Sequence, residues 1–335
     1  MLVAGVTACS HPPAPQPPIA KSRTAIALPQ APAEITYSGG SNKLYIAYVF
    51  PSNGWLVVPL SAPTTSHEFP DRAIAHAHHI VVDNKLKLGY ALGVSGTITV
   101  FNTDSDTTVA TTQPVCEAIV LAVDDRTGTV YGGGFSSRGE CLLQMDSSGH
   151  IVRDDVGGGT GSGHNINQRI AVDPTSGDVV YSDPWGITRV DASLKEKWST
   201  PVGKAFEPLD VGLEPRTNRT YVSLTGPNKV ALPASPPPSF RVYDRQNGKQ
   251  VGTVAGSAWE FVADDAGHVF TALSTASSRD LYVLTDGGTT PSKFASLGDI
   301  SGLKPSDLVF LQIDPSGHRL FVAAGDLKNV YVYAY

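Results

Sequence analysis

Seven times along the chain, a short apolar run is followed by an acidic turn and then by a second run rich in Val, Tyr and Phe. The clearest copies are AVDPTSGDVVYSD (171–183), LEPRTNRTYVSL (213–224) and QIDPSGHRLFVAA (312–324). Looser copies read VVDNKLKLGYAL, AVDDRTGTVYGG and VADDAGHVFTAL, and an eroded first copy reads ITYSGGSNKLYIAY. Short apolar runs bounded by turn residues are typical of β-strands. The pattern therefore predicts seven small sheets.

The acidic residue of the turn marks the place of each copy in the sequence. The markers are Asp83, Asp124, Asp173, Glu214, Asp264 and Asp314, with Ser38 at the matching place of the first copy. Successive markers are 41 to 50 residues apart, which is the period of a four-stranded propeller blade. Asp accepts hydrogen bonds from nearby backbone N–H groups, and the Gly or Asn that follows tolerates positive φ. We therefore expect the markers to form turns rather than to catalyse, in an all-β, seven-bladed β-propeller.

The two ends of the repeat region complete one another. After the last acidic turn only two strands remain, near 319–324 and 329–335, so the seventh blade lacks its outer strand. Residues 24–28 (TAIAL) precede the first blade and are expected to supply it. Closing the ring in this way removes an exposed strand edge, which otherwise favours aggregation. The prediction is one propeller domain over residues 24–335.

Composition and charge narrow the range of partners. The chain has 335 residues, a net charge of −6 and 17% charged residues. It contains no basic stripe with interleaved aromatic residues, so nucleic acid is not expected as a partner. No linker interrupts the repeats, so a single domain is expected. We also expect the protein to be a monomer.

Residues 1–9 carry targeting information. Val6-Thr7-Ala8-Cys9 resembles a bacterial lipobox, in which the cysteine is lipidated, and residues 10–23 form a Pro-rich tether. Such a tether extends by about 3 Å per residue, and the apolar stretch before Cys9 is too short to span a bilayer. The prediction is an exported, lipid-anchored envelope protein that touches the membrane through its lipid only. The positively charged region of an export signal is absent, which an upstream natural start explains; the alternative is a disordered tail on a cytosolic protein.

The two other cysteines both fall in the third blade. Cys116 precedes the innermost strand, and Cys141 opens the third strand. Regular positions two strands apart are separated by about 9.6 Å, whereas a disulfide requires Cα atoms within about 7 Å. A Cys116–Cys141 disulfide therefore requires that the loop carrying Cys116 folds inward over the blade. An oxidising compartment favours such a bond.

The repeat resembles a known family. The pattern DP-x-x-G/N-x-x-Y/F-V, followed by strands such as SFRVYDRQNGKQVGTV (239–254), is similar to the YVTN or YncE-like family of seven-bladed propellers. The resemblance covers nearly the whole chain beyond the Pro-rich tract. It implies an exported bacterial protein with a binding role. The expected function is a binding or scaffold module of the cell envelope, whose partner is an envelope protein or a small ligand on the loop-rich face.

The loops that enter the innermost strands are expected to converge on the propeller axis. Residues shortly before the markers form a polar, mostly acidic funnel: His76, His78, Glu117, Asn167, Arg169, Glu207, Trp259, Glu260 and Asp307. Side chains two apart on a strand project to the same side, so His76 and His78 share a face and His79 does not. With Glu117 or Glu34 across the channel, these histidines are candidate ligands for Zn, Cu or Ca. The alternative is that they hydrogen-bond the loop backbone.

A second resemblance points to an enzyme. The segments HNINQRIAVDPTSGDVVYSD and EPLDVGLEPRTNRTYVS are similar to the SMP-30/gluconolactonase propellers, which hold a divalent cation at the channel mouth. This resemblance implies Glu34, Asn167 and Asp210 as ligands of Ca or Zn, with Asp210 also acting as the catalytic base. The metal would polarise a lactone carbonyl and lower the pKa of water. That family is six-bladed, so a binding module without an obligatory cofactor is favoured and the metal-dependent hydrolase is kept as the alternative.

Overall fold

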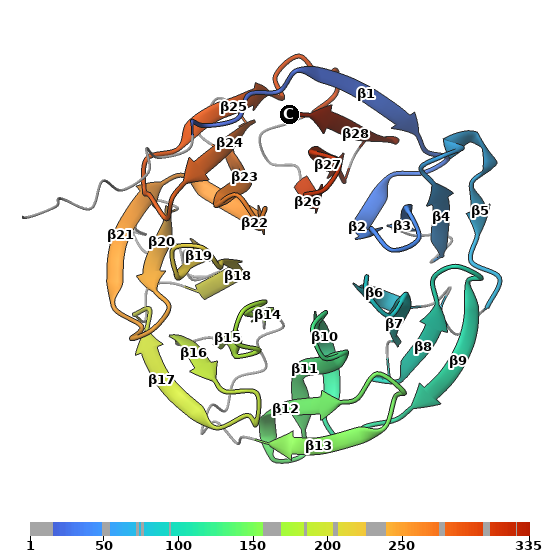
Figure 1. Cartoon of the computed structure of the whole chain (residues 1–335), viewed down its shortest axis with the longest axis vertical. Coiled ribbons are helices and arrows are strands. Elements are labelled where there is room, and N and C mark those ends of the chain that lie inside the picture. Colours follow the sequence, from blue (N-terminus) through green and yellow to red (C-terminus); the bar gives the residue numbers. More distant parts are fainter. Residues whose placement is uncertain are drawn as a thin grey trace, which may run out of the picture.

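Seven four-stranded antiparallel sheets stand around a central axis like the blades of a propeller (Figure 1). The computed structural model describes residues 16–48, 54–71, 74, 77–93, 95–156, 169–183, 186–203, 207–225, 239–274, 279–303, 309–325 and 327–335. The all-β, seven-bladed fold predicted from the repeats is confirmed. No helix in these ranges has the length and apolarity needed to cross a membrane.

Blades 1 to 4 each run in chain order from the axis to the rim. Blade 1 consists of β2 (Pro32–Ser38), β3 (Lys43–Tyr48), β4 (Trp55–Pro59) and β5 (His67–Glu68), with a 3₁₀ helix (Pro63–Thr65) before its last strand. Blade 2 consists of β6 (Ala77–Asp83), β7 (Leu88–Gly93), β8 (Ile98–Asn102) and β9 (Thr107–Thr112). Blade 3 consists of β10 (Glu117–Asp124), β11 (Thr129–Ser136), β12 (Gly139–Met145) and β13 (Ile151–Val156). Blade 4 consists of β14 (Arg169–Val172), β15 (Val179–Asp183), β16 (Gly186–Val190) and β17 (Glu196–Pro201).

Blades 5 and 6 repeat this order, and blade 7 closes the circle. Blade 5 consists of β18 (Glu207–Glu214), β19 (Arg219–Thr225), β20 (Ser239–Asp244) and β21 (Gln250–Ala255). Blade 6 consists of β22 (Ser257–Ala263), β23 (His268–Ser274), β24 (Arg279–Thr285) and β25 (Ser292–Ser296). Blade 7 consists of β26 (Val309–Asp314), β27 (Arg319–Ala324), β28 (Asn329–Ala334) and the N-terminal β1 (Ser22–Ala27).

The N-terminal strand closes the ring as the sequence predicted. β1 pairs antiparallel with β28 over six residues, from Ser22 opposite Ala334 to Ala27 opposite Asn329, and the two lie side by side in Figure 1. The strand begins two residues before the predicted 24–28, inside the segment assigned to the tether. Arg23 adds an ion pair to Asp299, at 3.0 Å between Nη1 and Oδ1. The seventh blade is therefore held by both ends of the chain.

The apolar core lies between the blades rather than on the axis. Buried hydrophobic residues of the described chain form seven clusters, and each cluster joins two neighbouring blades. Between blades 1 and 2, for example, the Tyr45 and Phe101 rings meet edge to face with centroids 5.4 Å apart. A Cβ at Gly89 would lie 2.1 Å from the Phe101 ring, so this packing requires glycine there. Because the core is distributed in this way, the axis is left open.

The marker acids form the turns between the first and second strands. We call these seven positions the turn ring: Ser38, Asp83, Asp124, Asp173, Glu214, Asp264 and Asp314. All seven side chains are buried, and each acid accepts a hydrogen bond from a backbone N–H two or three residues ahead. These hydrogen bonds are those of the turn-forming role expected for the markers. The turn ring is therefore part of the structural framework of the propeller, which we call the frame.

A disulfide joins Cys116 to Cys141, with the Cα atoms 5.8 Å apart. The two cysteines are thus closer than regular positions two strands apart, which are separated by about 9.6 Å. A Cβ at Gly134 would lie 2.0 Å from the carbonyl oxygen of Glu117, so glycine permits the close approach. Asp154 of β13 accepts the N–H groups of Val115 and Cys116 at 2.6 and 2.9 Å. The loop is thus fixed both covalently and by hydrogen bonds.

Candidate functional site

A cavity of about 760 Å³ lies on the propeller axis. The inner strands of all seven blades, β2, β6, β10, β14, β18, β22 and β26, contribute to its wall. Its size falls in the range of small-molecule binding sites. Every blade therefore contributes to this one cavity.

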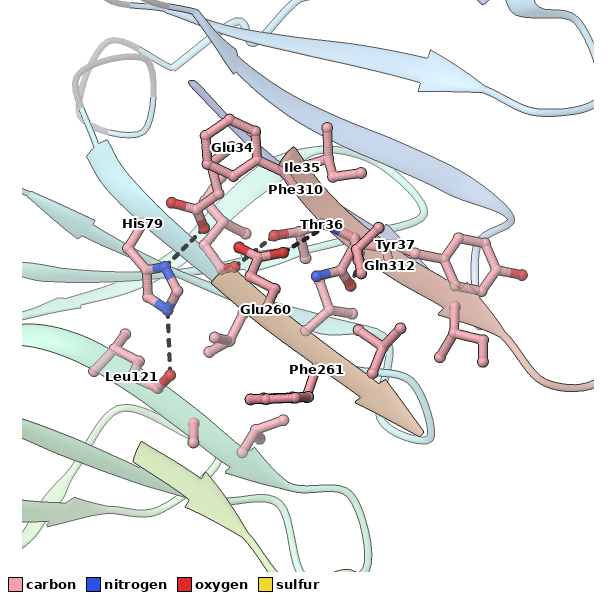
Figure 2. Close-up of a pocket in the computed structure, with 18 of the residues that line it drawn as sticks. Glu34, Ile35, Thr36, Tyr37, His79, Leu121, Glu260, Phe261, Phe310 and Gln312 are labelled. Atoms are coloured by element: carbon pink, nitrogen blue, oxygen red, sulfur yellow. Dashed lines mark hydrogen bonds and ion pairs between the residues drawn. The ribbon is translucent and has the colours of Figure 1, made fainter. Parts of the chain in front are cut away.

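One residue of each inner strand, four positions before the turn-ring residue, lines this cavity. We call these residues the axial ring: Glu34, His79, Val120, Arg169, Asp210, Glu260 and Phe310. The strand pairing shifts directly before the ring residue in β2, β6, β10 and β18, and across it in β22. Such β-bulges redirect a side chain relative to the regular alternation. In these five strands the bulge thus turns the ring side chain toward the axis, whereas the pairing of β14 and β26 with their next strands is regular. Figure 2 shows Glu34, His79, Glu260 and Phe310 around one space.

Glu34 and His79 form an ion pair between blades 1 and 2. His79 Nδ1 lies 2.7 Å from Glu34 Oε1, and His79 Nε2 lies 3.2 Å from the carbonyl oxygen of Leu121 in blade 3 (Figure 2). Burial alone would lower the pKa of His79, but the Glu34 charge and these hydrogen bonds raise it. Both ring nitrogens face acceptors, so the doubly protonated imidazolium fits the site.

Asp210 and Glu260 bridge the following blades. Asp210 Oδ2 accepts the N–H of Phe261 at 3.0 Å, and Glu260 Oε2 accepts the N–H of Leu311 at 2.6 Å. Burial raises the pKa of Asp210 to about 6, although Arg169 opposes the shift. Burial and then the charge of Asp210 raise the pKa of Glu260 to about 8. Near neutral pH the ring therefore holds a proton on Glu260 while Asp210 is mostly ionised.

The charges of the ring are arranged in an arc. Arg169 lies next to Asp210, with Nε 3.9 Å from Oδ1, and His79 lies next to Glu34. Glu260 and Phe310 lie between these two pairs in blade order. In blade order, the cationic side chains of Arg169 and His79 thus lie on either side of three acids, Asp210, Glu260 and Glu34. The Phe310 ring lies between the last two of these acids.

The cavity wall changes character below the axial ring. The residues two positions nearer the turns that line the cavity are mostly small or apolar: Thr36, Val81, Ala122, Val262 and Gln312. Side chains two apart on a strand share a face, so this layer repeats the ring geometry one step down. The cavity therefore offers a charged rim and a mainly apolar belt.

Four of the predicted site residues meet in the axial ring: Glu34, Arg169, Asp210 and Glu260. The expectation for the histidines is reversed. His78 is exposed, with Nε2 3.4 Å from the carbonyl oxygen of Ile119, whereas His79 lines the cavity. The bulge between Ala77 and His79 shifts the alternation by one residue. The alternative of backbone hydrogen bonding is thus what His78 shows.

Other predicted residues lie elsewhere. Glu117 begins β10 and is exposed, and Trp259 is half-buried on β22; neither is among the residues that line the cavity. His76, Asn167 and Asp307 lie outside the described residues, and Glu207 is placed only as the first residue of β18.

The expected metal site of Glu34, Asn167 and Asp210 cannot be assembled from the described chain, because Asn167 lies outside it. Glu34 is paired with His79 and Asp210 lies beside Arg169. Within the described ranges, no group of three or more His, Cys, Asp or Glu residues is arranged to hold a metal ion. The ring residue that sequence reasoning misassigned, His79, has a simple signal. It stands four residues before Asp83, as Glu34 stands before Ser38.

Comparison with known proteins supports the fold but identifies neither a family nor a function. No known family profile matches the chain, and no curated protein matches it. Among solved structures, 1453 chains match. One, from the crystal structure of the mitotic checkpoint complex, has a TM-score of 0.68 and 12% identity, covering 100% of this chain and 98% of that one. At this identity the likeness shows a β-propeller, a frame that carries many unrelated functions.

Proposed function

We propose that this protein is a binding module of the bacterial cell envelope, which seats a small ligand in the axial cavity against the axial ring. One observation carries the proposal. Charged or ionisable axial-ring side chains from five blades, Glu34, His79, Arg169, Asp210 and Glu260, converge on a single cavity of small-molecule size. A wall built from separate blades positions its groups without a change of fold, which lowers the cost of binding.

The ring groups are held in place before any ligand arrives. Asp210 and Glu260 each accept a backbone N–H of the next blade, and His79 bonds both Glu34 and a carbonyl of blade 3. Holding a carboxyl group with a raised pKa in a partly buried position costs stability. Such groups concentrate at functional sites, so they support a role for the ring beyond the frame.

Export and lipid anchoring are part of the same proposal. They are supported by the lipobox-like sequence ending at Cys9, by the Pro-rich segment after it, and by the Cys116–Cys141 disulfide, a bond typical of oxidising compartments. The YVTN or YncE-like resemblance agrees with them. Fractionation of cells that express the full chain tests this part, with Cys9→Ala as the variant. We expect the wild type in the membrane fraction and the variant released from it; equal distribution would contradict anchoring.

The metal-dependent lactonase-like hydrolase remains the second candidate. It is favoured by the pKa of Asp210 at about 6, because a general base works best with a pKa near the working pH. In that reaction Asp210 would take a proton from the attacking water.

A single preparation separates the two functions. The protein is purified without chelator or nickel, its metal content is measured, and its thermal unfolding is followed against a library of small cations, anions and neutral compounds. A binding module gives compound-dependent stabilisation that is lost in the double variant Asp210→Asn/Glu260→Gln, which removes two acids of the axial ring, and kept in Glu196→Gln, an exposed acid on the rim strand β17. Stoichiometric metal that Asp210→Asn loses, together with lactone hydrolysis, would establish the hydrolase instead. No stabilisation by any compound would contradict the binding function.

A further inference from the structure

We propose that the ligand of the axial cavity is a small organic cation, a protonated amine carried on a short apolar body, held between Glu260, Phe310 and Glu34. This inference rests on the proposed binding function and names its ligand class. It follows from three independent features of the ring, which are its charge order, its aromatic residue and the wall beneath it.

The charge order leaves one acid without a cationic partner. Arg169 lies 3.9 Å from Asp210, and His79 lies 2.7 Å from Glu34. Glu260 stands between these two pairs and, in the part of the chain that the structure describes, makes no ion pair. One of its oxygens accepts the N–H of Leu311; Oε1 has no hydrogen-bond partner among the described residues. A cation at this point would complete the arrangement.

The aromatic residue lies where such a cation would sit. Phe310 belongs to blade 7, between Glu260 of blade 6 and Glu34 of blade 1, and Figure 2 shows its ring beside Glu34. It packs on the apolar cluster between blades 7 and 1 and also lines the cavity. An aromatic face with carboxylates on either side suits an ammonium group, which gains from the ring quadrupole and from the acids.

The wall beneath the ring accounts for the apolar body. Val81, Ala122 and Val262 line the cavity one layer below the charged groups. A metal ion would leave this belt unused. An amine with a short hydrocarbon chain would fill it, and burial of the chain would add to affinity.

Binding of a cation should release a proton. Glu260 is faced by Asp210 from β18, by Arg169 from β14, by Glu34 from β2 and by the Leu311 N–H from β26. With its pKa at about 8, it is mainly protonated at pH 7. An ammonium group beside it favours the ionised form, so the proton leaves as the ligand enters. Affinity should therefore rise between pH 6 and 8.

The test is calorimetry of the full chain with n-hexylamine, 1-hexanol and hexanoate, in phosphate and in HEPES at pH 7. We expect hexylamine to bind at least about tenfold more tightly than hexanol and hexanoate. The difference in heat between the two buffers should correspond to the release of about one proton. Chelator should change neither result.

Two variants and one control locate the site. Glu260→Gln keeps an acceptor for the Leu311 N–H, and should weaken hexylamine about tenfold or more and abolish proton release. Phe310→Leu should weaken hexylamine about threefold and leave proton release unchanged. Glu196→Gln, which removes a charge at the rim, should alter neither.

Equal affinity for amine and alcohol, full affinity in Glu260→Gln, or no amine binding would each overturn the inference. If the compound library still reveals an anion or a neutral ligand whose binding requires Asp210, the cation inference fails and the binding function stands. If no compound binds at all, both fail. Amine binding that depends on added calcium would also overturn the inference, in favour of a metal-mediated contact.

Discussion

The turn ring and the axial ring lie on the same seven strands, four residues apart, and differ in almost every property. The turn ring has five Asp, one Glu and one Ser. The axial ring has six residue types among seven positions. The turn ring carries similar residues in every blade because every blade needs the same turn. The axial ring differs from blade to blade, so it has no such repeated structural role. A position of this second kind is the better candidate for a binding site.

The pKa shifts of the acids also differ between the two rings. In Asp124, Asp173 and Asp314, burial opposes ionisation, but neighbouring hydroxyl, backbone and arginine groups prevail and lower the pKa. In Asp210 and Glu260, burial prevails and the pKa rises. Asp83 differs from these three turn-ring acids. Burial raises its pKa, and no described ion pair compensates.

The largest expected effect comes from opening the circle on which both rings depend. Removal of residues 1–27 deletes β1 and exposes the edge of β28. We expect the melting temperature to fall by more than about 10 °C, which corresponds to several kcal/mol. Removal of residues 1–15 alone keeps β1 and should leave thermal unfolding unchanged. Equal melting of the two truncated chains would show that closure does not support the rings.

Asp173→Ala tests the turn ring as part of the frame. Asp173 caps its turn, and its Oδ1 lies 3.1 Å from Nη1 of Arg245, which is fully buried. Leaving that guanidinium without its carboxylate should cost about 3–5 kcal/mol, measured by denaturant unfolding. Asp191→Ala, which removes an exposed turn acid between β16 and β17, should cost about 1 kcal/mol or less. A similar small loss for both would contradict the contrast.

Glu260→Gln should do the reverse and stabilise the protein. The folded pKa of Glu260, about 8, lies above its ordinary value of 4.5. The folded state therefore keeps the proton longer, and the wild type loses stability as pH rises from about 4.5 to 8. The variant lacks this loss and should be more stable by about 2–4 kcal/mol at pH 9, with little difference at pH 4. Melting curves of the wild type and the variant between pH 4 and 9 test this prediction. A variant that is less stable than the wild type at pH 9 would show that ionised Glu260 stabilises the fold.

The smallest effect is expected for Glu34→Gln. The pKa of His79 is raised, so the pair with Glu34 stabilises the fold fully below pH 6.5 and this stability is lost as pH rises through the folded pKa. The variant should lose about 1 kcal/mol at pH 5 and nothing at pH 9. Proton NMR of the His79 ring measures the pKa directly. An unchanged His79 titration in the variant would show that Glu34 does not hold the proton there.

Much of the frame could be predicted, because turn chemistry and strand patterning are local. The marker acids gave the seven blades and the length of each repeat, and the missing strand of blade 7 predicted closure by the N-terminus. The start of β1 at Ser22 rather than residue 24 was missed, since the partner strand β28 decides where pairing begins. Gly134 beneath the Cys116 loop shows the same limit, since the approach of the two cysteines depends on a contact across the blade.

The site was predicted only in part. The sequence indicates Glu34, Arg169, Asp210 and Glu260 because they are polar residues shortly before the markers. By the same criterion it indicates Glu117, whereas Val120 lies on the ring. Regular alternation places His78 rather than His79 on the axis, and the bulge between Ala77 and His79 reverses this. A bulge adds one residue to one strand of a pair, and the choice of residue depends on the neighbouring strand.

By itself, the sequence determined the turns, the number of blades and the order in which ring residues follow one another, because each of these depends on neighbours a few residues away. The tertiary structure alone decided that residues from separate blades, such as Glu34 and Glu260, share one cavity, and which of their neighbours neutralise them. Closing the circle brings these groups out of bulk water and next to one another. Their pKa values and their fitness for a ligand follow from that enclosure.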